Sequence, residues 1–133
     1  MVAVGAASSQ AEAHALAVQL VKTHYMIEDG SLLFSPTKAA VKQFRRTLED
    51  AVSYFIGKQN TEDTGFALEP WSSIRFDNAG IVCRDDVGIA MGNYFFGRSD
   101  GSELMAEYSF VFVRDNTGQL KIQLHHSALP YRR

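Results

Sequence analysis

The chain has 133 residues, of which 46% are hydrophobic and 21% are charged, and its formal net charge is −2. A chain of this length and composition can bury a core of its own, so we expect one globular domain over residues 1–133. The small net charge predicts no nucleic-acid partner and no anionic membrane surface, and no apolar run reaches the ~18 residues of a membrane span.

The N-terminal part predicts one helix. Residues 1–8 lack the basic and apolar regions of an intact signal or transit peptide, and we expect them to be a disordered tail. Ser9 can cap the helix, and apolar residues then recur at helical spacing from Gln10 to about Glu28. Asp29-Gly30 ends this pattern, and Leu32–Phe34 follows as a short apolar link.

Two further helix starts follow closely on one another. Ser35-Pro36 places a capping hydroxyl before a proline, which suits the first position of a helix. Thr47 and Asp50 have the spacing of a capping box, with Asp50 in place of the usual glutamate. One helix reaching Phe55 would also fit the apolar pattern, but we favour two shorter helices with a break near 45–47.

The second half of the chain predicts an antiparallel sheet. Lys58–Gly65 is polar and predicts a loop, and from Pro70 onward the apolar pattern has period two. Tight turns between the strands imply a meander, and helices followed by such a sheet give the α+β class. Long strands twist and curl, so the sheet is expected to enclose a cavity. The four expected strands are Trp71–Arg84, Val87–Gly97, Glu103–Arg114 and Gln119–Ser127.

The last strand carries polar groups at its end. Apolar and polar residues alternate over Leu120–Leu124, and His125-His126-Ser127 follow directly. Strict alternation places His125 and Ser127 on the polar face with Lys121. Either a β-bulge reverses the alternation, or the polar face of this strand lines the cavity. The sequence leaves both alternatives open.

The histidines and the cysteine do not form an obvious metal site. Cys83 stands alone, which also leaves no internal disulfide. His125 and His126 are neighbours in a strand, so their side chains face opposite ways. His14 and His24 are separated by about 15 Å along the predicted helix. The residues therefore favour a site that works without a metal.

The chain resembles a known family in four stretches. Helices followed by a long curled meander resemble the NTF2-like cone fold and, within it, the association domain of calcium/calmodulin-dependent kinase II. The chain is more similar to the iota-class carbonic anhydrases, whose domains end in His-His-Ser-Ser-x-Pro. Here Ala128 replaces the second serine. The matching stretches are Ser35–Ala40, Ser53–Gly57, Met91–Phe96 and His125–Pro130.

This resemblance implies an enzyme that reversibly hydrates CO2 to bicarbonate. It implies a metal-independent lyase with no cofactor, with manganese or zinc as the less favoured alternative. It also implies a chloroplast or a bacterial cytoplasm or periplasm as the compartment. The family's reactive groups match, by motif, Thr37, Tyr54, His125 and Ser127. In such a site the hydroxyls would orient the water and donate to the bicarbonate oxygens, and the imidazole would exchange the proton.

The two-helix prediction has a consequence for this site. On one continuous helix Thr37 and Tyr54 would lie about 25 Å apart, at roughly 1.5 Å per residue. They could not then share a site. The catalytic assignment therefore requires the chain to turn between them.

Two other functions are compatible with the same fold. An isomerase or ligand-binding protein would need a buried carboxylate base, for which Glu107 is the candidate. An association module would use the outer face of the third strand, which is apolar on both faces. A homodimer is expected under all three functions. The apolar residues of that strand are Phe110, Val111, Phe112 and Val113.

Overall fold

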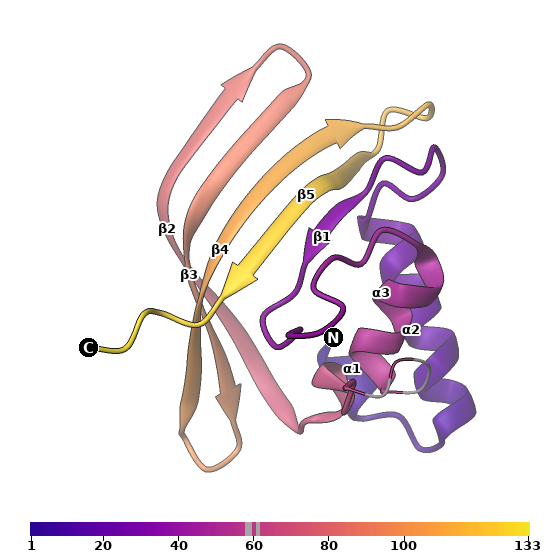
Figure 1. Ribbon diagram of the computed structural model, residues 1–133, viewed down its shortest axis with the longest axis vertical. Coiled ribbons are helices and arrows are strands. Elements are labelled where there is room, and N and C mark those ends of the chain that lie inside the picture. The colour runs from indigo at the N-terminus through magenta and orange to yellow at the C-terminus, as the bar shows by residue number, and fades with distance from the viewer. Residues whose placement is uncertain (58–59, 61) are drawn as a thin grey trace.

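The computed structural model describes residues 1–57, 60 and 62–133, and in them helices cover one face of a curled five-stranded sheet (Figure 1). The predicted α+β class is confirmed. None of the described helices combines the length and apolar character needed to cross a bilayer. The helical elements are α1 (Val2–Gly5), α2 (Gln10–His24), α3 (Leu48–Ile56) and the 3-10 turn η1 (Phe66–Leu68). The strands are β1 (Leu33–Ser35), β2 (Trp71–Arg84), β3 (Val87–Arg98), β4 (Glu103–Arg114) and β5 (Leu120–Ala128).

The four long strands form the predicted antiparallel meander, with bounds within one residue of those expected. Strand β1 adds a fifth, parallel member beside β5, in which Leu33 pairs with Leu124. We expected only an apolar link there. Three residues are too few to display an alternating pattern, and their pairing depends on a strand about 90 residues later in the chain.

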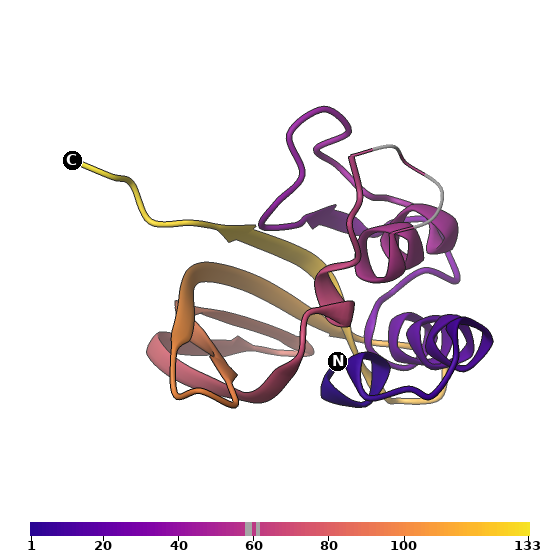
Figure 2. The ribbon, with the colours of Figure 1, turned by 90° about the horizontal axis from the view of Figure 1, so that it is seen from below.

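The sheet curls around the helices, which lie on its concave side (Figure 2). Register shifts in β2 between Trp71 and Ser73 and between Asn78 and Gly80 mark irregularities that bend this strand. A Cβ atom at Gly92 would collide with the carbonyl of Asp77 on the neighbouring strand. Glycine therefore permits the close approach of β2 and β3 where the sheet bends.

Helix α2 begins as predicted and ends early. The Ser9 hydroxyl accepts a hydrogen bond from the Glu12 N–H at 3.1 Å, which satisfies one free donor of the first turn. The helix ends at His24 rather than near Glu28. It ends there because the backbone turns to pair with β5: the Met26 N–H donates to the Ile122 carbonyl at 2.8 Å.

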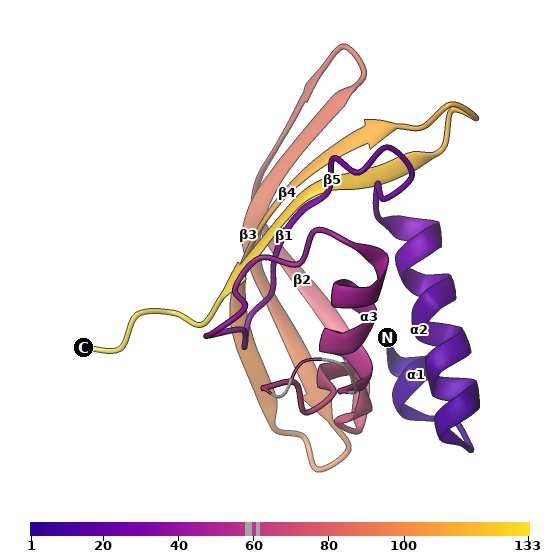
Figure 3. The same cartoon turned by 45° about the vertical axis from the view of Figure 1, so that its right-hand side comes forward.

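Helix α3 also begins and ends as its sequence predicts. The Thr47 hydroxyl accepts from the Asp50 N–H, and Gly57 ends the helix with φ of 77°, a conformation that favours glycine. Figure 3 shows α3 between α2 and the sheet. Its apolar residues join a core that combines aromatic with aliphatic side chains.

The prediction of a helix that begins at Ser35-Pro36 is wrong, because residues 36–46 form a loop. Here the backbone finds partners outside the segment. The N–H groups of Ala40 and Lys42 each donate to the Glu62 carboxylate at 2.6 Å. These long-range hydrogen bonds replace the ones a helix would have made.

The structure contains a helix where we expected a disordered N-terminal tail, and it describes only part of the predicted loop 58–65. We expected a disordered tail over residues 1–8, but residues 2–5 form α1 and the Val4 side chain is buried in the core. The predicted loop Lys58–Gly65 includes residues 58, 59 and 61, which lie outside the described residues. Its described part contains no helix or strand.

Candidate active site

A β-bulge in β5 decides which face His125 occupies. Phe110 and Phe112 lie two apart on β4 and so share one face; Phe110 pairs with His125 and Phe112 with Ile122. Directly opposed residues in an antiparallel pair point to the same side. His125 and Ile122 therefore both face the helices, with the alternation reversed at Gln123. Of the two alternatives left open by the sequence, the bulge is confirmed.

His125 is buried and hydrogen-bonded at both ring nitrogens. The Tyr25 hydroxyl lies 2.8 Å from Nδ1, and the Tyr94 hydroxyl lies 3.1 Å from Nε2. The imidazole also packs against the rings of Phe34 and Phe110, with centroids 4.9 and 4.4 Å away. Burial, and secondarily the charge of His126, lower the pKa of His125 to about 3. The imidazole is therefore neutral at physiological pH.

Three hydroxyls meet next to this imidazole. Thr37 Oγ1 and Ser127 Oγ are 2.5 Å apart, and the Tyr94 hydroxyl donates to Ser127 Oγ. Because Tyr94 gives its proton to Ser127, the hydrogen bond from His125 to Tyr94 runs from Nε2–H. Nδ1 then accepts from Tyr25. A continuous chain of hydrogen bonds thus joins Thr37 to Tyr25.

Tyr54 reaches the same place from α3. Its hydroxyl accepts from the Lys38 N–H at 3.3 Å. Burial raises the pKa of Tyr54, although hydrogen bonds from Lys38 and Thr37 act in the opposite direction. Burial likewise raises the pKa of Tyr94. Both phenols therefore stay protonated and are hydrogen-bond donors rather than bases.

The structure thus brings together all four residues selected from the sequence. The chain turns between Thr37 and Tyr54, as the assignment required. Sequence reasoning missed Tyr94 and Tyr25. Tyr94 lies inside the Met91–Phe96 stretch that carried the family resemblance, which is a signal that could have identified it. Tyr25 looked like an ordinary apolar position of a helix, and nothing in the sequence links it to His125, 100 residues later.

These groups border a small apolar cavity of about 130 Å³ between the helices and the sheet. Its wall is mostly aromatic, and its polar side chains are those of Tyr25, Thr37, Tyr54, Tyr94 and His125. A molecule of liquid water occupies about 30 Å³, so the cavity has the size for a water and one small substrate. The aromatic wall includes Phe34, Phe55, Phe66, Phe76, Phe96 and Phe110.

A buried ion pair fixes the loop that carries Thr37. The Arg45 side chain is fully buried, and its guanidinium donates to both Asp63 carboxylate oxygens at 2.7 Å. Arg45 Nε also donates to the Lys42 carbonyl at 2.7 Å. The backbone N–H groups of 40–42 hold the pKa of Glu62 below its usual range. Loop 36–46 is therefore held by charge-assisted hydrogen bonds at both Arg45 and Glu62.

The remaining candidate groups lie elsewhere. His14, His24 and His126 are exposed. Glu107, the candidate base of an isomerase, is exposed and lies between the buried Ala106 and Tyr108, so it faces away from the cavity. Among the described residues, no group of three or more His, Cys, Asp or Glu side chains is placed to hold a metal ion.

Comparison of the sequence with a family model and with known proteins points to the same family. The sequence model of a family described as metal-independent carbonic anhydrase matches residues 1–129. A metal-independent carbonic anhydrase of Nostoc sp. strain PCC 7120 is 36% identical over 128 residues, which cover 94% of this chain. The match covers 62% of that relative, so the chain spans less than two thirds of its length.

Several solved structures are similar to this chain, at very different levels of sequence identity. An iota-carbonic anhydrase from a cyanobacterium, in complex with bicarbonate, has a TM-score of 0.94 and 33% identity, covering 99% of this chain and 84% of that one. An NTF2-like superfamily protein of Salmonella enterica serovar Typhimurium has a TM-score of 0.55 and 13% identity, covering 86% and 78%. The second likeness concerns the fold alone. The predicted NTF2-like cone fold is confirmed.

Proposed function

Because the chain belongs to the metal-independent carbonic anhydrase family, we propose that it reversibly hydrates CO2 to bicarbonate without a metal. One observation carries the proposal: the hydroxyls of Thr37 and Ser127 and the neutral imidazole of His125 are linked beside a small aromatic cavity. CO2 is small and apolar and suits such a wall. A line of polar atoms at its edge suits water and bicarbonate.

In the proposed reaction the oxygen of a bound water forms a bond to the carbon of CO2. Thr37 and Ser127 hold that water, which converts a bimolecular encounter into a positioned one. One C=O electron pair moves onto its oxygen, and the protonated Tyr54 hydroxyl donates to the negative charge that develops. The products are bicarbonate and the proton that the water loses.

The proton passes into the hydrogen-bonded chain. Hydration begins with the Tyr25 oxygen deprotonated and Nδ1–H of His125 donating to it. Ser127 then passes a proton to Tyr94, Tyr94 passes one to Nε2, and Nδ1 passes one to Tyr25, which restores the resting hydrogen-bond directions. His125 gives up one proton as it takes another, so no imidazolium ion forms. This matters because the low pKa of His125 makes its charged form costly.

Ala128, the departure from the family signature, does not remove a hydroxyl from this cavity. It follows Ser127 in the strand, so its side chain points to the opposite face of the sheet. It pairs there with the exposed Glu107. This orientation supports activity in spite of the missing second serine.

Stopped-flow measurement of CO2 hydration tests the proposal. The purified, folded protein is assayed as isolated, after EDTA treatment and dialysis, and with added Mn²⁺ or Zn²⁺. We expect the same rate in all three states. A rate no higher than that of buffer refutes the activity, and a rate that requires an added ion refutes its metal independence.

The proposal extends to a homodimer. The convex face of the sheet exposes Ile89 and Met91 on β3, with Val111 of β4 directly opposite Ile89, and exposed apolar residues on one sheet face are typical of an interface. Sedimentation that shows only monomer would contradict the dimer. The compartment and the single-domain boundary stay predictions.

A further inference from the structure

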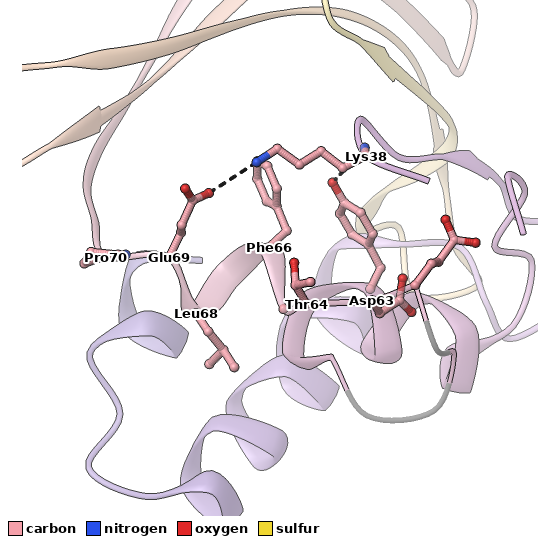
Figure 4. A pocket seen from close by; sticks show the side chains of 10 residues that line it. Lys38, Asp63, Thr64, Phe66, Leu68, Glu69 and Pro70 are labelled. Atoms are coloured by element: carbon pink, nitrogen blue, oxygen red, sulfur yellow. Dashed lines mark hydrogen bonds and ion pairs between the residues drawn. The ribbon is translucent and has the colours of Figure 1, made fainter. Parts of the chain in front are cut away.

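A second, larger pocket shares Tyr54 and Phe66 with the aromatic cavity, and Figure 4 shows the side chains that line it. Its volume is about 430 Å³, against about 130 Å³ for the aromatic cavity. Both rings line both spaces, so they form a shared wall. The larger pocket is polar, since Lys38, Thr64 and Glu69 contribute to its lining. The proposed site therefore lies between an apolar and a polar compartment.

Two of the carboxylates in this outer pocket are already engaged. Asp63 accepts two hydrogen bonds from the Arg45 guanidinium, and Glu62 accepts from the N–H groups of 40–42. Glu69 has a cation of its own in Arg98, at 3.2 Å. Each carboxylate of the described lining residues thus has hydrogen-bond partners other than Lys38.

Lys38 is loosely held. Its ammonium lies 3.6 Å from Glu69, its side chain is 44% exposed, and it extends over the Phe66 ring at 5.7 Å from the centroid. Figure 4 shows the side chain crossing the pocket towards Glu69. The backbone N–H of the same residue donates to the Tyr54 hydroxyl. Lys38 therefore contacts the proposed reaction site with its main chain and the outer pocket with its side chain.

We propose that the outer pocket is a second binding site for bicarbonate, between the aromatic cavity and solvent, in which the Lys38 ammonium exchanges Glu69 for the anion. The inference rests on the proposed function, which forms bicarbonate at the polar edge of a mostly aromatic cavity. A charged product moves towards a polar compartment and a cation, while CO2 favours the aromatic one. Four flexible methylene groups allow the ammonium to move between the two partners.

Two substitutions with opposite expected effects test this site. Lys38→Met keeps the aliphatic stem and removes the cation, so the KM for bicarbonate in the dehydration direction rises about two- to fivefold, as loss of one exposed ion pair gives. Glu69→Gln removes the competing carboxylate, so the same KM falls. The KM for CO2 stays at the wild-type value in both variants, whereas damage to the reaction cavity would change it.

Lys42→Met is the matched control. Lys42 lies on the same loop and pairs with Asp50 at 2.6 Å, outside the pocket lining. We expect it to leave both KM values unchanged. An unchanged KM for bicarbonate in Lys38→Met, or a raised one in Glu69→Gln, overturns the proposal.

A binding measurement separates this inference from the proposed function. Titration of ¹⁵N-labelled protein with bicarbonate is expected to shift the amide signals of Thr64 and Gly65 in the wild type and not in Lys38→Met. An inactive wild type refutes the hydration activity, yet the titration still reports on the pocket. Amide shifts that are the same in both proteins show that the Lys38 ammonium does not bind the anion.

Discussion

Removing the Tyr94 hydroxyl interrupts the proton path without changing the shape of the cavity. Tyr94→Phe deletes one oxygen atom, which donates to Ser127 Oγ and lies 3.1 Å from His125 Nε2. Among the described residues, the Tyr94 oxygen is the atom that joins Ser127 to His125, because it makes one hydrogen bond to each of them. Positioned proton transfer contributes roughly 100- to 10,000-fold to a rate. Since Thr37 still contacts Ser127, we expect kcat to fall by roughly 100-fold, the lower end of that range.

Tyr94→Phe is also expected to lower the free energy of unfolding by a small amount. The ring remains, so no large cavity opens, but a buried imidazole nitrogen loses its partner. Such a loss costs about 1–3 kcal/mol. Urea unfolding followed by circular dichroism should show a decrease of this size, and the protein stays folded under assay conditions.

Tyr108→Phe is the matched control for Tyr94→Phe. Tyr108 is a buried phenol on the same face of the sheet, with its ring centroid 5.3 Å from that of Tyr94. Its hydroxyl donates to the Asn78 side chain instead of the proposed site. Stopped-flow hydration should therefore show kcat near the wild-type value. Equal losses in the two variants, or full activity in folded Tyr94→Phe, would refute the proton path.

Three further predictions concern the site and its support. Tyr54→Phe and Ser127→Ala each lower the hydration rate at least tenfold while the circular dichroism spectrum stays unchanged, because each removes a donor or a water ligand. Arg45→Ala leaves Asp63 buried without its cation and lowers the free energy of unfolding by about 3–5 kcal/mol in urea. Between pH 6.5 and 5, stability falls with falling pH by up to about 1.4 kcal/mol per unit, because unfolding lets His125 take up a proton.

The sign of the pH effect follows from the direction of the pKa shift. The pKa of His125 is lower in the folded state, so below about 6.5 the unfolded chain binds more protons and gains stability relative to the fold. His125→Phe should lose this part of the pH dependence, and an unchanged slope would contradict it. For the ion pair, the double variant Arg45→Met with Asp63→Leu should lose less stability than Arg45→Ala. A larger loss would show that packing, rather than an unpaired charge, dominates.

The four long strands and α3 were predictable because their signals are local. The period-two alternation lies within the strands, and the turn residues and the Thr47 cap lie directly beside the elements that they specify. Loop 36–46 was not predictable, because Ser35-Pro36 is a good helix start and the partners of its backbone include Tyr54 and Glu62, which lie some 20 residues later. The short strand β1 depends in the same way on β5.

The site was predictable in part for a related reason. Five of its side chains, Tyr94 included, stand in stretches shared with a known family, so their identity was available from the sequence. Their geometry was not. The bulge at Gln123 involves a register shift between two strands, and the partnership of Tyr25 with His125 arises only when the end of α2 reaches β5. Neither feature has a local signature.

The hydrogen bonds of the site span nearly the whole chain. Tyr25 and His125 are 100 residues apart, and Thr37 and Ser127 are 90 apart. No fragment that lacks either Tyr25 or Ser127 contains the complete constellation. Contacts of such long sequence separation form late and slowly during folding. Catalysis in a refolding experiment would then report completion of the entire domain, whereas secondary structure would recover earlier.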